Sequence, residues 1–554
     1  MNAAPATFAQ RWDSAVETSG SQPFLVFEGP DGAVSQWTYR EFDEVVRQMG
    51  AMLAAAGVTH GSAVHVVLRN CPAFIAIWLA CARSGAWLVP ADPTSSARDI
   101  SRQLDRIRPA AGVCAASRAD VYQAGVHESA AGRLVTIELA ETAADVAPGA
   151  VFCPTGAPAK DAVPARDALP VQDALPVQDA LPARDALPAQ NAVPVQDVVP
   201  VRAVAPSDRL AVMFTSGTTS EPKGVVLTQR NYAQVADAMS AVVGLGPQDR
   251  WLVTLPLFHA NAQYYCIAPA IAAGASVALT ASFSASQWLR QARDLSATHA
   301  SLFAAPIRMI LARRPADAAP VALKHVWFAQ NLGPQHYEEF ARLAGCRPRQ
   351  LYGMTETVAV VCADVSDPYR NDTIGPPVEG RAVVLRSPET GAEAKPGQPG
   401  ELVLRGIAGE DLFAGYLDDP AATSRALVQR DGATWFHTGD VVEPVGDDGA
   451  LRFVGRRDDV IKVSGENVSL TEVEAILAQA PGVLECAVLG RPDPVRDMVP
   501  VAYVVPRDRE NPPAVDDLAQ WSAQNLAAAA RPRDWHLIDA LPRTSVGKVR
   551  RFKL

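Results

Sequence analysis

The sequence lacks several features that would place the chain in a special class. Its eight cysteines form no C-x-x-C pair, so their spacing predicts neither a zinc site nor a redox pair. Lys and Arg number 50 against 60 Asp and Glu, a net charge of −10, whereas nucleic-acid-binding proteins gather basic residues on one face. Apolar runs such as AFIAIWLACA are too short to span a bilayer. The start of the chain has no basic residues followed by an apolar run, so we expect no signal peptide.

The composition that is present is typical of a globular protein with more than one domain. Hydrophobic residues make up 48% of the 554 residues and charged residues 20%. A chain of this length exceeds what one compact core accommodates, so we expect at least two domains. Sparse thiols without a pattern fit a reducing compartment, and we expect the protein to be cytoplasmic.

Strand-like and helical patterns alternate over residues 33–140 and again from 208 to about 457. The stretch WTYREFDEVVRQMGAMLAAAG has helical spacing, AVHVVLRN reads as a buried strand, AFIAIWLACARSGA as a helix and WLVPADP as a strand. This alternation predicts an α/β fold with a parallel sheet covered by helices on both faces. A charged joint at Arg456–Asp459 precedes a smaller αβ unit that runs to Leu554, which suggests a domain boundary there.

Residues 149–206 interrupt this order with a repeat of period six, approximately D-A-L-P-V-Q. Proline recurs every sixth position from 164 to 206, and Asp or Asn shares the period. Prolines at this frequency are incompatible with a helix or a central strand. A hexad β-helix would need glycine-rich turns and an unbroken ladder, so we interpret the segment as an extended linker or surface insert without a catalytic role.

The stretch TSGTTSEPKG, residues 215–224, lies between the apolar runs LAVMF and VVL. Its ten residues include five hydroxyls, two glycines and a lysine. Backbone N–H groups and hydroxyls presented by one turn can bind an anion, and a lysine adds a mobile positive charge. The same composition is also found in ordinary polar turns, and the Walker A pattern is absent. The stretch by itself leaves both interpretations open.

The other motifs favour anion binding. TSGTTSEPKG resembles the phosphate loop of the adenylate-forming superfamily, which includes acyl-CoA synthetases, carrier-protein-loading adenylation domains and firefly luciferase. Further motifs similar to that family follow in its order: LPLFHAN (255–261), YGMTET (352–357), FHTGD (436–440), GRRDDVIKVSGENVS (455–469) and PRTSVGKVRR (542–551). The resemblance covers the whole chain except the proline repeat.

This resemblance implies a fold, an activity and cofactors. The fold is a large N-terminal α/β domain, residues 1–457, with parallel sheets, helices and a β-barrel-like part, followed by a small mobile α+β domain, residues 458–554. The activity is that of an AMP-forming acid–thiol ligase that uses ATP, Mg²⁺ and coenzyme A. A carboxylate attacks the α-phosphate of ATP, and a thiol then attacks the acyl carbonyl of the acyl-AMP and releases AMP. The protein's task is to position charged reactants and neutralise developing charge.

Roles for single residues follow from the same resemblance. Glu356 should help to hold Mg²⁺, a hard cation that suits carboxylate and phosphate oxygens. Thr355 should lie near the α-phosphate and Tyr352 should stack on adenine. Asp440 should accept hydrogen bonds from both ribose hydroxyls, with Arg456 reaching the same ribose. The β- and γ-phosphates should be wrapped by six residues of the loop: Thr215, Ser216, Gly217, Thr218, Thr219 and Lys223.

The C-terminal motifs imply a lysine that moves. Lys548 should bridge the carboxylate and the α-phosphate, which suits a point charge on a flexible stem. Asp458 corresponds to the hinge about which the small domain rotates between half-reactions. Gly465 should then lie near the thiol tunnel.

The acid is less well specified than the nucleotide. His259 occupies the family's substrate-gate position, and Asn261 and Gln263 follow where a long-chain enzyme would want apolar groups. A buried amide without a partner costs about 1–3 kcal/mol, so a polar lining favours a small polar acid. The alternative is that both amides bond to backbone inside the fold. FHANAQ, FAQNLGPQ and KVSGENVS look most like the carnitine/crotonobetaine CoA ligase branch.

We therefore predict an acyl-CoA synthetase that acts on a small carboxylic acid, with no nucleic-acid partner and no membrane span. One alternative is an enzyme that loads a separate carrier protein; others are a medium- or long-chain fatty acid CoA ligase and a luciferase-like oxidation. A non-catalytic scaffold whose proline repeat docks a partner is a rival of another class, but Lys548, Glu356 and Asp440 argue against it.

Overall fold

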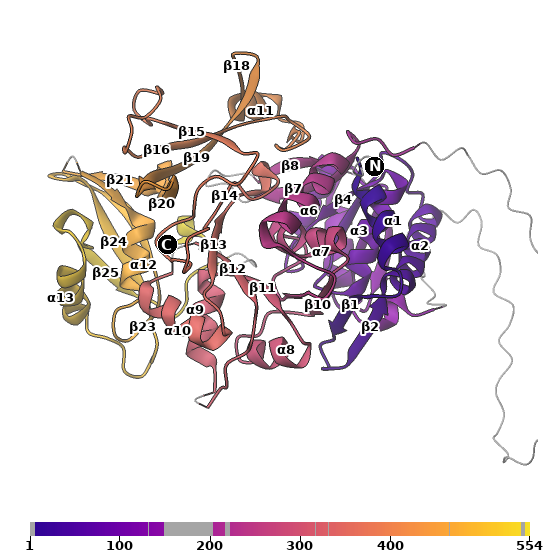
Figure 1. Ribbon diagram of the computed structural model, residues 1–554, viewed down its shortest axis with the longest axis horizontal. Helices are drawn as coiled ribbons and strands as arrows, with labels where there is room; N and C mark the ends of the chain where they lie inside the picture. The colour runs from indigo at the N-terminus through magenta and orange to yellow at the C-terminus, as the bar shows by residue number, and fades with distance from the viewer. Residues whose placement is uncertain are drawn as a thin grey trace, which may run out of the picture.

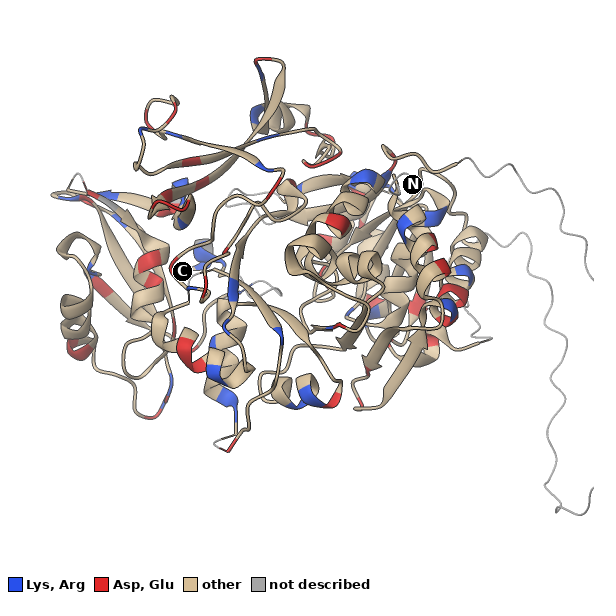
Figure 2. Cartoon of the chain, viewed as in Figure 1, with Lys and Arg blue, Asp and Glu red and all other residues tan. Residues whose placement is uncertain are grey.

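The computed structural model describes most of the chain, and the strands of the described residues form four sheets (Figure 1). The described residues are 6–130, 132–148, 203–215, 222–315, 317–330, 332–464, 466–543 and 549–554, with the backbone alone at 458, 467 and 552. The proline repeat therefore lies outside the described residues, apart from its last few positions. Lys and Arg are interspersed with Asp and Glu over the described elements (Figure 2).

Two large sheets carry the N-terminal part. The first is parallel except at its two edges, and its order is β14 (Cys362–Ala363), β13 (Arg349–Tyr352), β12 (His325–Ala329), β11 (His299–Phe303), β9 (Arg250–Val253), β10 (Ser276–Thr280), β1 (Pro23–Glu28) and β2 (Val34–Thr38). The second runs β17 (Gly415–Tyr416), β8 (Lys223–Thr228), β7 (Arg209–Thr215), β4 (Trp87–Pro90), β3 (Ala63–Val67), β5 (Ala111–Ala115) and β6 (Val135–Leu139). The strands from β7 to β6 are parallel, and β8 and β17 are antiparallel.

Helices cover these sheets, as the alternating pattern predicts. The two helices expected from the sequence are α2 (Tyr39–Ala55) and α3 (Pro72–Ser84). Every residue of α3 from Pro72 to Ala82 is buried, as expected for a helix that is apolar on all sides. The remaining helices of this part are α1 (Phe8–Ser19), α4 (Ala97–Ile107), α5 (Ala119–Glu128), α6 (Gln229–Val243), α7 (Ala268–Ala273), α8 (Trp288–Asp294), α9 (Ala304–Arg313) and α10 (Pro334–Ala344).

Aromatic rings join the helices that lie between the sheets. Phe8 of α1 stacks on Trp78 of α3 with ring centroids 5.0 Å apart, and Tyr232 of α6 contacts both rings. Trp12 and Trp78 are fully buried. Such rings bury large apolar areas, so α1, α3 and α6 form the centre of the core.

Two smaller sheets complete the fold: the first is antiparallel, and the second is antiparallel except for one parallel strand pair. The part that was expected to be barrel-like contains β15 (Ala382–Arg386), β16 (Gly400–Gly406), β18 (Leu427–Arg430), β19 (Ala433–Val445) and β20 (Ala450–Arg456), with the short helix α11 (Pro420–Ala426). The C-terminal unit contains β21 (Val460–Val463), β22 (Glu466–Ser469), β23 (Val483–Asp493), β24 (Asp497–Pro506) and β25 (Asp534–Leu537), with α12 (Leu470–Leu477) and α13 (Val515–Asn525). It packs beside α9 and α10, where a Cβ at Gly333 would overlap the Gln479 side chain.

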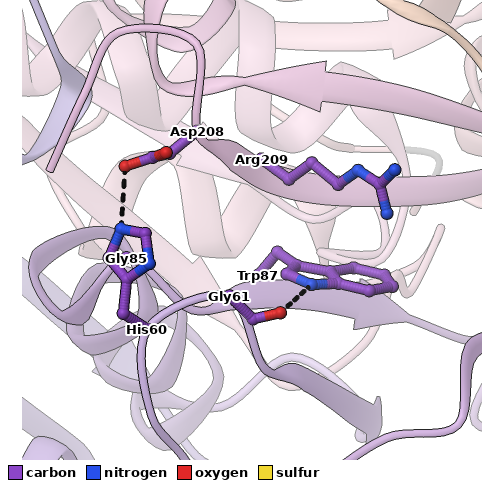
Figure 3. A pocket seen from close by; sticks show the side chains of 6 residues that line it. All are labelled: His60, Gly61, Gly85, Trp87, Asp208 and Arg209. Atoms are coloured by element: carbon purple, nitrogen blue, oxygen red, sulfur yellow. Dashed lines mark hydrogen bonds and ion pairs between the residues drawn. The ribbon is translucent and has the colours of Figure 1, made fainter.

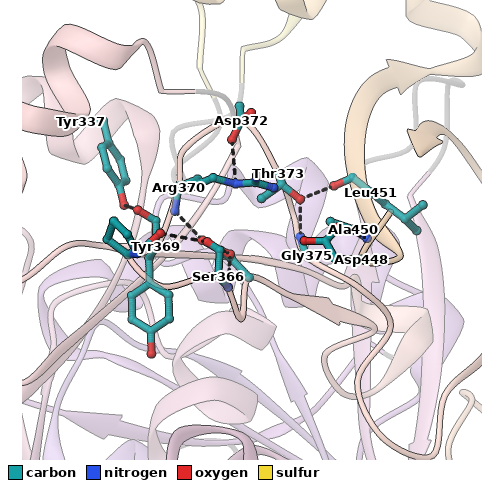
Figure 4. A network of polar contacts seen from close by, with 12 residues as sticks. Tyr337, Ser366, Tyr369, Arg370, Asp372, Thr373, Gly375, Asp448, Ala450 and Leu451 are labelled. Carbon is teal, nitrogen blue, oxygen red and sulfur yellow. Dashed lines mark hydrogen bonds and ion pairs between the residues drawn. The ribbon is translucent and has the colours of Figure 1, made fainter. Parts of the chain in front are cut away.

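A polar network fixes the loop that follows β14 (Figure 4). The carboxylate of Asp364 accepts hydrogen bonds from the backbone N–H groups of Ser366 and Arg370. Thr373 donates its hydroxyl to the carbonyl oxygen of Leu451 at 2.8 Å, which ties the loop to β20. The loop therefore connects the first sheet to the smaller antiparallel sheet.

Asn70 links the two large sheets and supplies a stability test. It is buried, donates to the carbonyl oxygens of Leu255 and Thr280 at 3.1 Å, and accepts the Leu257 N–H at 2.8 Å. Asn70→Ala leaves these groups unpaired, so we expect a loss of about 2–3 kcal/mol in the free energy of unfolding. A lower urea midpoint and faster hydrogen exchange at Leu257 would report the loss.

The exposed Asn525→Ala is the matched control, because Asn525 donates only to the Trp521 carbonyl oxygen at the surface. Equal midpoints for the two variants would contradict the assigned role of Asn70.

Candidate active site

The candidate site lies where strands of different sheets end. The hydroxyl-rich loop follows the carboxyl end of β7, and YGMTET begins in β13. Carboxyl ends of parallel strands are where open α/β sheets bind ligands. Thr215 and Lys223 face each other across β7 and β8, and the Thr215 hydroxyl donates to the Lys223 carbonyl oxygen at 3.4 Å. Ser216, Gly217, Thr218 and Thr219 lie outside the described residues.

Arg106 of α4 holds both stems of this loop. Its guanidinium lies 5.0 Å from the centroid of the Phe214 ring on the incoming strand. It also donates to the carbonyl oxygen of Pro222 at 2.7 Å, on the outgoing side. Because both stems are fixed by one side chain, Arg106 contributes to positioning the loop.

Three predicted nucleotide-binding residues meet at Asp440. The Tyr352 hydroxyl donates to Asp440 Oδ2 at 2.6 Å, and Arg456 Nη1 lies 3.1 Å from Asp440 Oδ1. Asp440 and Arg456 are register partners on β19 and β20, and Asp440 is 5% exposed. Antiparallel pairing thus places a carboxylate and a guanidinium side by side at the end of β13.

Burial and charge shape this cluster. Burial and then the negative charge of Asp440 raise the pKa of Tyr352 well above its usual value, so its hydroxyl stays a donor. Burial alone would lower the pKa of Arg456, but the combined effect of Asp440, Tyr352, Glu356 and Asp459 raises it. The guanidinium is therefore fully charged beside the carboxylate.

Glu401 supports the turn before Asp440. Its Oε1 accepts the Gly439 N–H at 3.1 Å and lies 3.4 Å from His437 Nδ1. Gly439 has φ of +71°, which glycine adopts without steric cost. Burial alone would raise the pKa of Glu401, but hydrogen bonds from His437 and the Gly439 N–H lower it. The turn is thus held by a charged group on β16.

Glu356 lies one turn beyond Tyr352, in the short 3₁₀ helix Thr355–Thr357. It is 6% exposed, whereas Thr355 is intermediate. Tyr416 of β17 donates its hydroxyl to Glu356 Oε1 at 3.2 Å, and Lys223 Nζ lies 4.9 Å from the centroid of the same tyrosine ring. Tyr416 therefore contacts both the predicted metal-binding carboxylate and the predicted phosphate-binding lysine.

The predicted metal-binding carboxylate of Glu356 suits a magnesium ion that arrives bound to the phosphates of a nucleotide. The described residues hold no group of three or more His, Cys, Asp or Glu that could bind an ion without other ligands. Mg²⁺ commonly takes one or two carboxylates together with phosphate oxygens and water. Glu356, fixed by Tyr416, would supply one such carboxylate.

Arg381, whose side chain is 7% exposed, holds the backbone around Glu356. It donates to the carbonyl oxygens of Thr357 at 2.8 Å, Val360 at 3.2 Å and Asp411 at 2.8 Å. It thereby fixes the segment that follows the 3₁₀ helix to the segment that precedes β17.

The predicted wall of the acid pocket is a π-helix, Asn261–Ile267. Gln263 is fully buried, donates to the Leu257 carbonyl oxygen at 2.7 Å and accepts the Tyr232 hydroxyl at 2.6 Å, so its amide is used inside the fold. Asn261 is 3% exposed, and its Oδ1 has no hydrogen-bond partner among the described residues. The same holds for the buried hydroxyl of Tyr264, which finds no partner in the described part of the chain. His259 accepts the Asn261 N–H at 3.3 Å, and its ring lies edge-on to Phe303.

The π-helix touches the nucleotide motif directly. A Cβ at Gly353 would lie 2.5 Å from the Tyr265 hydroxyl oxygen, so glycine permits this approach. Unusual π-helical turns often occur at functional sites. The wall that carries Asn261 is therefore adjacent to the turn between Tyr352 and Glu356.

The predicted hinge and lysine loop are only partly described. The backbone of Asp458 lies in the 3₁₀ helix Arg457–Asp459, and Gly465 and Lys548 lie outside the described residues. Arg543 and Val549, which belong to the lysine motif and lie on either side of Lys548 in sequence, form an antiparallel bridge. Arg551 pairs with Asp459 at 2.9 Å and with Glu474 at 2.8 Å. These pairs attach the end of the chain to the C-terminal unit.

Sequence reasoning missed Arg106, Arg381, Glu401 and Tyr416. Tyr416 and Glu401 belong to apolar strand-like stretches, where an aromatic or a single acid is unremarkable in sequence. Arg106 and Arg381 act through contacts with residues far away along the chain. Only the pairing of β17 with β8 shows that Tyr416 is near Lys223.

A pocket of about 200 Å³ lies elsewhere, at the amino ends of β3, β4 and β7 (Figure 3). His60 Nε2 lies 2.9 Å from Asp208 Oδ2 there, and the Trp87 indole donates to the Gly61 carbonyl oxygen. Arg209 lies over Trp87, 5.5 Å from the ring centroid. No predicted site residue is among the six that line it, and it is at the opposite end of the sheet from the hydroxyl-rich loop.

Two family models match the chain. The model described as AMP-binding enzyme matches residues 12–417, and the model described as AMP-binding enzyme C-terminal domain matches residues 472–548. Among curated relatives, the crotonobetaine/carnitine–CoA ligase of Proteus mirabilis is 28% identical over 542 residues, covering 98% of this chain and 97% of the relative. The crotonobetaine/carnitine–CoA ligase of Salmonella arizonae is 29% identical over 544 residues, with coverages of 98% and 97%.

Solved structures share the fold over almost the whole chain. The anthranilate CoA ligase AuaEII in complex with anthranoyl-AMP has a TM-score of 0.80 at 21% identity and covers 99% of this chain and 96% of its own. ATP-bound MatB from Rhodopseudomonas palustris has a TM-score of 0.78 at 21% identity, with coverages of 99% and 98%. The o-succinylbenzoate CoA synthetase of Bacillus subtilis with ATP and magnesium has a TM-score of 0.76 at 22% identity, with both coverages 98%. The predicted fold class is confirmed.

Proposed function

The chain belongs to the AMP-binding enzyme family, and we propose that it is an ATP-dependent acyl-CoA synthetase acting on a small, polar carboxylic acid. The observation that carries the proposal is the meeting of Tyr352, Asp440 and Arg456 beside Glu356, Tyr416 and Lys223. The group at Asp440 suits a ribose, and the group at Glu356 suits a polyphosphate that carries a metal ion. Arg456 contributes to the electrostatics of Glu356 and Tyr416 as well as Asp440, so the two sets share one neighbourhood.

In the first half-reaction, a carboxylate oxygen of the acid attacks the α-phosphorus of ATP, and the bond to pyrophosphate breaks. Asp440 would accept hydrogen bonds from the ribose hydroxyls, and Tyr352 would stack on adenine. Arg456 would keep the carboxylate of Asp440 oriented. Thr215, Lys223 and the hydroxyl-rich loop would hold the leaving pyrophosphate. Mg²⁺ bound at Glu356 would neutralise phosphate charge, with Thr355 near the α-phosphate.

In the second half-reaction, the sulfur of coenzyme A attacks the acyl carbonyl, and the bond to AMP breaks. We propose that Lys548 serves the first step and that rotation at Asp458 brings Gly465 toward the thiol for the second. The domain boundary would then lie between residues 457 and 458. The charged 3₁₀ helix at Arg457–Asp459 supports a hinge there, because a few residues outside regular strands can absorb a large change in φ and ψ.

The preference for a polar acid depends on the π-helix. Asn261 Oδ1 and the Tyr264 hydroxyl are buried and find no partner within the part of the chain that the structure describes, and a buried polar group without a partner costs about 1–3 kcal/mol. An acid with a polar or charged group could satisfy them, whereas an alkyl chain could not. Gln263 would stabilise the π-helix and would not contact the acid, since the oxygen and the nitrogen of its amide are both already hydrogen-bonded.

We also propose that the enzyme works in a reducing compartment such as the cytoplasm. The seven described cysteines are free thiols, and most are buried. Within the described residues, no helix combines the length and apolar character that crossing a bilayer requires.

The test is acid-dependent exchange of labelled pyrophosphate into ATP, run with short polar, zwitterionic, aromatic and fatty acids. We expect a short polar or zwitterionic acid to exceed fatty acids by at least about 10-fold, the discrimination that a few unpaired polar groups provide. Preference for a medium- or long-chain fatty acid would contradict the polar pocket. Absence of exchange with every acid would contradict adenylation itself.

The acceptor is tested by adding coenzyme A or candidate carrier proteins to the acyl-AMP. Thioester formation with coenzyme A alone would support the proposal. Transfer only to a carrier protein would identify a carrier-loading enzyme instead.

A further inference from the structure

Tyr416 lies between the two charged residues that the proposed reaction needs at the phosphates. Its hydroxyl donates to Glu356 Oε1 at 3.2 Å, and its ring carries Lys223 Nζ at 4.9 Å from the centroid. Glu356 and Lys223 come from different sheets, because Glu356 follows β13 and Lys223 begins β8. One side chain thus contacts a carboxylate and an ammonium that are 133 positions apart in sequence.

The ring is held by the backbone that surrounds it. Tyr416 pairs with Val225 of β8, and the Leu417 N–H donates to the Gly224 carbonyl oxygen at 2.7 Å. The Tyr416 N–H donates to Thr423 Oγ1 at 2.9 Å. Since β17 is attached to the strand that Lys223 begins, the backbone places the ring beside the lysine.

The same segment is attached to the metal-binding side. The Phe413 N–H donates to the backbone carbonyl oxygen of Glu356 at 3.0 Å, and the rings of Phe413 and Tyr416 lie 4.8 Å apart. Glu356 is therefore fixed to residues 413–416 through both its backbone and its carboxylate.

We propose that Tyr416 is a positioning residue that sets Glu356 for Mg²⁺ and Lys223 for phosphate, and so couples metal binding to nucleotide binding. The inference rests on the proposed function. A hydrogen bond to one carboxylate oxygen orients the group that would bind the metal. A cation over an aromatic face is held more weakly than in an ion pair, so Lys223 can leave the ring for a phosphate oxygen.

The test measures ATP binding by calorimetry as a function of Mg²⁺ concentration, for the wild type and Tyr416→Phe. The phenylalanine keeps the ring and loses only the hydroxyl. We expect the Mg²⁺ concentration for half-maximal stimulation of binding to rise about 10-fold, the lower end of the cost of losing a hydrogen bond to a metal-binding group. ATP affinity in EDTA should be unchanged.

Two further variants separate positioning from a general loss of stability. Tyr416→Leu also removes the ring, so it should weaken ATP binding in EDTA as well. Tyr39→Phe is the matched control, because its buried hydroxyl donates to the Ala270 and Ala275 carbonyl oxygens in the core. It should lower the melting temperature without moving the Mg²⁺ midpoint. Should Tyr416→Phe fail to fold, Thr423→Val removes the bond that holds the Tyr416 backbone and should shift the midpoint in the same direction.

The outcomes distinguish this inference from the proposed function. A Mg²⁺ midpoint within twofold of the wild type in Tyr416→Phe overturns the inference, whatever the enzyme's activity. A shifted midpoint in a protein that shows no pyrophosphate exchange with any acid supports the inference and overturns the proposed function.

Discussion

Asp440→Asn is expected to raise the KM for ATP and lower adenylate formation by about 100-fold or more in kcat/KM. The carboxylate accepts the Tyr352 hydroxyl at 2.6 Å and lies 3.1 Å from Arg456, and it would also accept the ribose hydroxyls. Hydrogen bonds to a charged group contribute about 1.5–3 kcal/mol each, and tenfold corresponds to about 1.4 kcal/mol. Pyrophosphate exchange at varied ATP measures both parameters.

The matched control for Asp440→Asn is Glu28→Gln, which weakens another buried ion pair. Glu28 accepts from Arg290 at 2.7 Å and from Gln291 at 2.9 Å, at the end of β1. Breaking it should lower the melting temperature and leave the KM for ATP unchanged. Equal effects of the two variants on that KM would show that Asp440 acts through stability alone.

The second large effect is a separation of the half-reactions by Lys548→Ala and Asp458→Pro. We expect Lys548→Ala to lower adenylation about 1000-fold, the upper range for losing one group that stabilises transition-state charge. Thioester formation from preformed acyl-AMP should persist in this variant. Asp458→Pro should do the opposite, because proline fixes φ near −65° and prevents rotation at the hinge. Single-turnover assays of each half-reaction make the comparison.

Two alanine variants show whether the loss of a charge by itself explains the effects. Lys553→Ala removes an exposed lysine from the same tail, and Asp458→Ala removes the hinge carboxylate while leaving φ unrestricted. Both should retain at least half of each half-reaction. If Lys548→Ala lost both half-reactions equally, a role confined to adenylation would be wrong.

Sequence patterning predicted local structure well where burial decides it. The helices in WTYREFDEVVRQMGAMLAAAG and AFIAIWLACARSGA are present as α2 and α3, and AVHVVLRN contains β3. The predicted family is confirmed by models that match residues 12–417 and 472–548. Motifs succeed in this case because short, ordered stretches keep the residue types that the chemistry needs.

The roles of the polar side chains near the acid were less predictable. The sequence placed Asn261 and Gln263 two positions apart and left open whether either amide bonds inside the fold. The π-helix and the neighbouring Tyr232 determine that the amide of Gln263 is hydrogen-bonded internally, whereas Asn261 Oδ1 has no hydrogen-bond partner among the residues described. Spacing alone does not reveal this difference, because partners come from distant residues.

The sequence by itself determined the family and the alternation of strands and helices, and it predicted site residues such as Asp440 and Glu356, because these depend on local patterns. The tertiary structure decided which of them meet. Arg456 reaches Asp440 through the pairing of β19 with β20, and Tyr416 reaches Lys223 and Glu356 through the pairing of β17 with β8. Strand pairing joins residues far apart in the chain through backbone hydrogen bonds, which carry no signature in the side-chain sequence.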